Sequence, residues 1–188
     1  MTTVNNKKTW AVRMAGLDAG LCLILGGGLG VRNYQVNHTV DATDSLDVNQ
    51  SVEIKINQKE RILDVIALNE DGRTIVGDMD FSGSSLDVAV NAIIGSLLQN
   101  GYLNELANSV LISVDNIDPV RGMALQERLA DEVNKLLQTD SFRGAVLSQT
   151  VVKSDELQQM AEQYGITLGK AQLIQEILGK NSLHTFDE

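Results

Sequence analysis

The sequence predicts an α+β fold, in which an N-terminal transmembrane helix precedes a mixed sheet packed by three to four helices. Short segments that alternate apolar and polar residues indicate strands, and longer segments with apolar residues every three to four positions indicate helices. Strands come first and later strands are mixed with helices, an order typical of α+β proteins rather than of doubly wound sheets. An apolar run with basic residues at its start indicates the membrane helix.

The apolar run at residues 10–31 predicts a membrane-spanning helix. Its last 18 residues carry a single charge, that of Asp18. At about 1.5 Å per residue the run reaches about 33 Å, enough to cross a hydrocarbon core of about 30 Å. Because Lys7 and Lys8 precede it, the positive-inside rule predicts a short cytoplasmic head at residues 1–9 and an extracytoplasmic body in a single-pass protein of the cell membrane.

Two other interpretations of this run stay open. Asp18 would cost about 2.5–3.5 kcal/mol at a helix centre on insertion scales, and six glycines between Met14 and Val31 weaken a helix. The alternatives are a cleaved signal peptide, although no small-x-small cleavage site follows clearly, and a buried glycine-rich helix or loop of a soluble protein.

The next segment predicts the first strands of the sheet. Residues 51–57 (SVEIKIN) alternate apolar and polar side chains, which predicts a half-buried strand. Residues 61–68 (RILDVIAL) are denser in apolar residues and predict a more buried strand. Asp71-Gly72 is a strong hairpin signal, so residues 73–76 are expected to return as the partner strand.

The rest of the chain predicts four helices and two further strands. Each of three helices begins after a capping residue whose side chain can accept hydrogen bonds from free backbone N–H groups. These caps are Ser84 or Ser85, Asp118 before Pro119, and Ser154. The helices are expected at residues 85–101, 119–138, 154–164 and 168–178, the strands at 110–114 and 145–152, and a frayed tail at 181–188.

Apolar side chains on the facing sides of these elements predict the core. We expect it to lie where the first helices pack on the sheet. The predicted core residues are Ile62, Val65, Ile66, Leu68, Ile93, Leu97, Leu111, Ile112, Leu129 and Val133.

Composition argues against several classes of function. A net charge of −10 does not suit a nucleic-acid partner, because binding to phosphates needs a basic face. With Cys22 as the one cysteine, neither an internal disulfide nor a Cys-rich zinc site can form. His38 and His184 stand alone, and no nucleophile–base pair is recognisable. We therefore expect no metal, no cofactor and no conventional enzyme.

Three segments resemble one family of membrane regulators. Residues 45–72 (SLDVNQSVEIKINQKERILDVIALNEDG) resemble the start of the extracytoplasmic middle domain of RsgI-like membrane anti-sigma factors, with its SLDVNPSIEL and ALNEDG motifs. The helix and the VLISV strand that follow keep the family's order, and residues 164–177 (YGITLGKAQLIQEI) are similar to its closing helices. The resemblance covers residues 7–180 and identifies residues 37–180 as the middle domain.

The resemblance implies signalling across a membrane. In this family a cytosolic domain holds a sigma factor, one helix crosses the membrane, and the outer domain passes on a signal that triggers intramembrane proteolysis. We therefore expect membrane lipid and an intramembrane or site protease as partners. Since nine residues precede the predicted span, a sigma factor is expected to be only an indirect partner. The alternative is a soluble or secreted α+β binding module without a signalling role.

The resemblance also marks the Asn49–Gln50 bond as a candidate self-cleavage site. The family's middle domain is associated with self-cleavage at an Asn-Pro bond, in which the Asn amide attacks its own carbonyl and expels the next nitrogen. Proline closes the competing deamidation route because it has no N–H. Gln50 restores that N–H and removes the restraint that proline places on the preceding residue. We expect a largely intact bond, with Asn49 in an ordinary turn.

Overall fold

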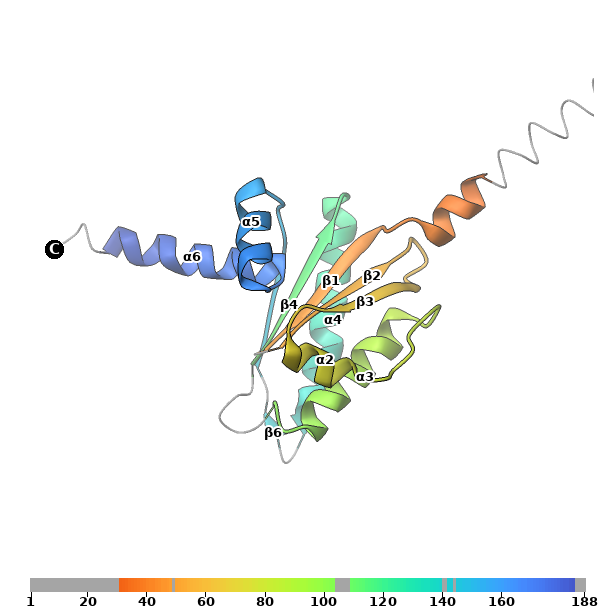
Figure 1. Cartoon of the computed structure of the whole chain (residues 1–188), viewed down its shortest axis with the longest axis horizontal. Helices are drawn as coiled ribbons and strands as arrows, with labels where there is room; N and C mark the ends of the chain where they lie inside the picture. Colours follow the sequence, from red (N-terminus) through yellow and green to blue (C-terminus); the bar gives the residue numbers. More distant parts are fainter. Residues whose placement is uncertain (1–30, 49, 104–108, 140–141, 144, 185–188) are drawn as a thin grey trace, which may run out of the picture. The chain divides into compact units, whose positions relative to one another are not determined.

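The computed structural model describes residues 31–48, 50–103, 109–139, 142–143 and 145–184, and the chain divides into two units, Met1–Thr39 and Val40–Glu188 (Figure 1). In the first unit, residues 31–38 form a helix. All but the last residue of the predicted span lie outside the described residues. Among the residues that are described, no helix combines the length and the apolar character needed to cross a membrane.

A five-stranded mixed sheet forms the centre of the second unit. Its central strand β1 pairs antiparallel with β2 and β4, β3 pairs antiparallel with β2, and β7 runs parallel to β4 along the other edge. The α+β class and the mixed sheet are thereby confirmed. The strands are β1 (Ala42–Asp47), β2 (Ser51–Ile56), β3 (Ile62–Ala67), β4 (Ser109–Asn116) and β7 (Ala145–Thr150), with a separate two-residue pair β5 (Gln138–Thr139) and β6 (Phe142–Arg143).

The helices lie on both faces of this sheet. Helices α3 and α4 cover one face, whereas α5 and α6 lie on the other side, where α6 contacts β4 (Figure 1). Asp118 begins α4 as predicted, because its Oδ1 accepts hydrogen bonds from two backbone N–H groups of the first turn. The helices are α2 (Glu70–Val76), α3 (Leu86–Gln99), α4 (Pro119–Leu137), α5 (Asp155–Tyr164) and α6 (Leu168–His184).

The hydrophobic core lies between the sheet and helices α3 and α4. Seven of the ten predicted core residues are buried, whereas Val65, Ile66 and Leu68 are half-buried because they belong to the edge strand β3 or follow it. Leu111 is buried on the opposite face, since side chains alternate along β4. The largest fully buried apolar side chains include Ile54, Ile56, Ile93, Ile94, Ile112, Leu129 and Leu137.

The predicted hairpin at Asp71-Gly72 is wrong, because these residues lie in helix α2. The side chain of Asn69 caps the helix by accepting a hydrogen bond from the Gly72 N–H at 2.8 Å. Glu70 and Asp71 then stand in the first turn, where negative charge interacts favourably with the helix dipole. These capping signals outweigh the turn preference of an Asp-Gly pair, so residues 73–76 continue the helix.

The predicted end of the last helix is also wrong. Helix α6 continues to His184, six residues past the predicted end at residue 178. Residues 181–184 are therefore helical rather than part of a frayed tail, because Gly179 does not end the helix. The remaining residues of the predicted tail, 185–188, lie outside the described part of the chain.

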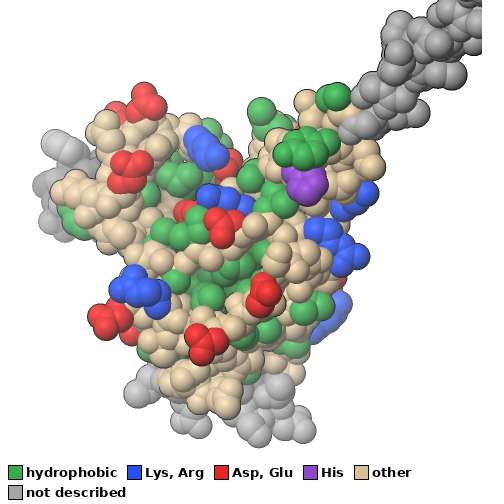
Figure 2. Space-filling model, turned by 45° about the vertical axis from the view of Figure 1, so that its right-hand side comes forward, with side chains coloured by type: hydrophobic (Ala, Val, Ile, Leu, Met, Phe, Trp, Pro, Cys, Tyr) green, Lys and Arg blue, Asp and Glu red, His purple; other side chains and the backbone are tan. Residues whose placement is uncertain are grey.

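Charged side chains of both signs are interspersed on the surface shown in Figure 2, with apolar side chains exposed between them near its centre. Several carboxylates are held in ion pairs, such as those of Arg128 with Glu60 and Asp87. Ion pairs this exposed contribute little to stability, about 0–1 kcal/mol each.

Candidate functional site

The predicted Asn49–Gln50 bond lies in the loop that joins β1 to β2. Asp47 pairs with Ser51 at the base of this hairpin, so residues 48–50 form the loop. Asn49 lies outside the described residues. Gln50 is 1% exposed, and its two amide atoms have no hydrogen-bond partner among the described residues. The loop thus buries a polar side chain at the position where the resemblance expects proline.

A buried carboxyl fixes one side of this loop. Asp47 accepts hydrogen bonds from the hydroxyls of Ser51 at 2.7 Å and Thr167 at 2.5 Å. The Thr167 hydroxyl also accepts from the Lys170 N–H at 3.0 Å, and the Lys170 ammonium donates to the Val48 carbonyl at 3.2 Å. The start of helix α6 is therefore tied to both Asp47 and the loop.

The cap of helix α2 fixes the other side of the loop. The Asn69 side-chain oxygen that caps α2 also accepts from the Ser51 N–H at 3.3 Å, and the Leu68 N–H donates to the Ser51 carbonyl at 2.9 Å. A Cβ on Gly72 would lie 2.9 Å from that carbonyl oxygen, which is too close for a side chain. The glycine therefore lets α2 approach the strand closely.

Burial raises the pKa of Asp47 above the ordinary value of a carboxyl, although the hydrogen bonds from Thr167 and Ser51 favour its ionised form. This carboxyl lies at the base of the loop, where it pairs with Ser51.

The residues that surround the loop come from three separate segments. Sequence reasoning named Asn49 and Gln50 as the site but missed Asp47, Asn69 and Thr167. The signal that could have found them is the resemblance itself, because its SLDVN, ALNEDG and YGITLGK segments each supply one of the three. Each of the three motifs thus contributes one side chain to the hydrogen bonds around this loop.

A second buried carboxyl, that of Asp44, lies in the core. Asp44 stands on β1 opposite Ile54 and Val114, is 1% exposed, and has no hydrogen-bond partner for either oxygen among the described residues. Burial raises its pKa to about 8, against the opposing effect of the positive charge of Arg128. Asp44 is therefore mainly protonated at neutral pH.

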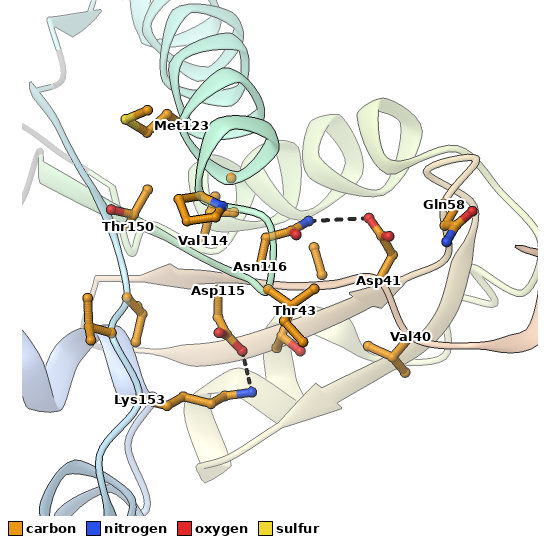
Figure 3. Close-up of a pocket in the computed structure, with 16 residues that line it drawn as sticks. Val40, Asp41, Thr43, Gln58, Val114, Asp115, Asn116, Met123, Thr150 and Lys153 are labelled. Carbon is orange, nitrogen blue, oxygen red and sulfur yellow. Dashed lines mark hydrogen bonds and ion pairs between the residues drawn. The ribbon is translucent and has the colours of Figure 1, made fainter.

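A pocket of about 680 Å³ opens at the end of the sheet opposite to the loop (Figure 3). Its walls are the start of β1, the end of β4, the first turn of α4 and the end of β7. Two carboxylates at its rim are ion-paired, Asp41 with Arg121 at 2.8 Å and Asp115 with Lys153. In the part of the chain that the structure describes, no three His, Cys, Asp or Glu side chains gather as metal ligands would.

Comparisons with known proteins place these features in a family. Residues 41–176 match the model of the anti-sigma factor RsgI-like central domain. The chain is 28% identical over 167 residues to anti-sigma-I factor RsgI7 of Acetivibrio thermocellus, and the aligned region covers 88% of this chain and 30% of the relative. It is 25% identical over 185 residues to anti-sigma-I factor RsgI9 of the same organism, covering 94% and 26%. The chain thus spans less than a third of the length of these curated relatives.

Proposed function

Because this chain belongs to the family of the anti-sigma factor RsgI-like central domain, we propose that it is a single-pass membrane protein that relays a signal toward a sigma factor. The match over residues 41–176 carries the proposal, together with the apolar run that precedes it at residues 10–31. The matched domain lies outside the cell in this arrangement. It therefore controls the sigma factor indirectly, across the membrane, and its output is the access of a membrane protease to the span.

Membrane integration and topology test this proposal directly. We expect the chain to stay in the membrane after carbonate extraction, and the domain to be digested by protease added to intact, right-side-out cells. Asp18→Leu removes the one charge in the last 18 residues of the run and should increase the integrated fraction. A chain that carbonate extracts completely would favour the alternative, a soluble or secreted binding module.

We further propose that the candidate self-cleavage site is vestigial and that the Asn49–Gln50 bond stays intact. Gln50 is buried, and its side-chain amide has no hydrogen-bond partner among the described residues, which supports the idea that this position suits proline better than glutamine. Its N–H leaves deamidation open as a competing route for Asn49. The domain then acts as a binding and relay module and not as an enzyme.

Intact-mass spectrometry of two variants tests the role of position 50. Gln50→Pro should produce two fragments that separate after residue 49, because proline closes the deamidation route. Gln50→Ala removes the same amide but keeps the backbone N–H, so it serves as the matched control and should stay uncleaved. Two co-purifying fragments from the unmodified chain would overturn the proposal that Gln50 disables the reaction.

A further inference from the structure

The pocket at the end of the sheet is surrounded by exposed aliphatic side chains. Four residues that line it are largely exposed: Ile117 (97%), Val152 (75%), Met123 (49%) and Val40 (48%). They come from four different parts of the fold, and Figure 3 shows Val40 and Met123 on opposite sides of the pocket. Single exposed aliphatic residues are ordinary, but four around one opening form a patch that indicates a binding surface. We call these four residues the apolar pole.

Two of the carboxylates beside the apolar pole are held in ion pairs. Asp41 and Asp115 each have an ion-pair partner at the pocket rim, namely Arg121 and Lys153. The chain as a whole carries a net charge of −10. The pairing of these two carboxylates lowers the electrostatic cost of bringing this end of the domain against a surface that carries negative charge.

Only a short stretch of chain separates the apolar pole from the proposed membrane span. Val40 belongs to the pole and is also the first residue of the second unit. The proposed span ends at residue 31, and residues 31–38 are helical, so they extend about 12 Å. Two further residues add at most about 7 Å. The pole therefore begins within about 20 Å of the end of the span.

We propose that the apolar pole docks on the lipid surface of the membrane in which the chain is anchored, with Ile117, Met123, Val152 and Val40 entering the headgroup region. This inference rests on the proposed function, because the span supplies the tether. A short tether keeps the bilayer at a high effective concentration next to the pole, and aliphatic side chains gain from burial at the boundary between headgroups and acyl chains.

Docking would fix the orientation of the domain. Strand β1 runs from the pole to the loop at residues 48–50, and its six residues extend about 20 Å. The loop therefore points away from the docked membrane, together with helix α2 and the start of α6, which hold it.

Fluorescence of the full chain in vesicles of phosphatidylcholine and phosphatidylglycerol tests the docking. In a Cys22→Ser background, Ile117→Cys carries an environment-sensitive probe at the pole. Leu98→Cys carries the same probe near the far end of α3 and is the matched control, since Leu98 is also partly exposed, at 38%. We expect blue-shifted emission and quenching by brominated phospholipid at position 117, and neither at position 98. Circular dichroism establishes that both variants are folded.

Flotation of the same vesicles separates the failure of this inference from that of the proposed function. If the chain floats with the vesicles but the probe at position 117 stays in water, the docking is wrong and the span is retained. A blue shift at position 117 without lipid quenching would mean that a second copy of the chain covers the pole, which also overturns lipid docking. If the chain does not float, both the span and the docking are wrong.

Discussion

Replacing Asp44 with asparagine is expected to remove a large pH-dependent cost of folding. Burial raises the pKa of Asp44 from 3.8 to about 8, so below pH 3.8 the carboxyl is protonated in both the folded and the unfolded chain. Between pH 3.8 and 8 the folded chain must keep a proton that the unfolded chain releases. The free energy of unfolding therefore falls by about 1.4 kcal/mol per pH unit in this range, which amounts to about 4 kcal/mol at pH 7. Above a pH of about 8 the loss levels off.

Urea denaturation at several pH values, followed by circular dichroism, measures this effect. An asparagine side chain cannot ionise in either state, so the advantage of Asp44→Asn over the unmodified chain should grow by about 3 kcal/mol between pH 5 and pH 7. Burial also raises the pKa of Asp47 and Glu53, but both residues are present in both proteins and cancel in the comparison. An advantage that does not change with pH would refute the assignment of a neutral Asp44.

Three further predictions concern packing and capping, each measured as the change in unfolding free energy in urea. Leu97→Ala should lower the unfolding free energy by about 2–5 kcal/mol because Leu97 is buried. Leu98→Ala at its exposed neighbour should lower it by less than about 0.5 kcal/mol. Equal losses would mean that the faces of α3 are misassigned. Gly169→Ala should cost about 1–3 kcal/mol, since its Cβ would clash with the Ser113 side chain, and a neutral result would show that α6 does not pack there. Asn69→Ala should cost about 1–2 kcal/mol through the lost cap of α2, and an unchanged stability would contradict the capping geometry.

Most elements of the fold could be predicted from local patterns, because their buried faces are apolar and their ends carry capping residues. Strand β1 (ATDSLD) does not fit such a pattern, since four of its six residues are polar. Three of them, Asp44, Ser45 and Asp47, are buried, and no periodicity distinguishes a buried carboxyl from an exposed one. Tertiary contacts, such as the hydrogen bond from Thr167 to Asp47, decide where these side chains lie.

The surroundings of the candidate site could not be predicted for a related reason. The hydrogen bond between Asp47 and Thr167 joins residues that are 120 positions apart. Local spacing carries no information about such a contact, which depends on how α6 packs against β4. The resemblance could point to the segments involved, but the role of each side chain becomes visible only when the fold brings them together.

Strand β1 connects the two sites that the structure presents. It begins next to Val40 at the apolar pole, ends at the loop of residues 48–50, and pairs along its whole length with both β2 and β4. A chain cut after residue 49 would leave β1 held to the rest of the domain only by these pairs and by side-chain contacts. With Gln50 and an intact bond, β1 is also joined covalently to β2. A pull at Val40 would then have to unfold the domain before β1 could separate from it, so the residue at position 50 would set how the domain responds to a force applied at its start.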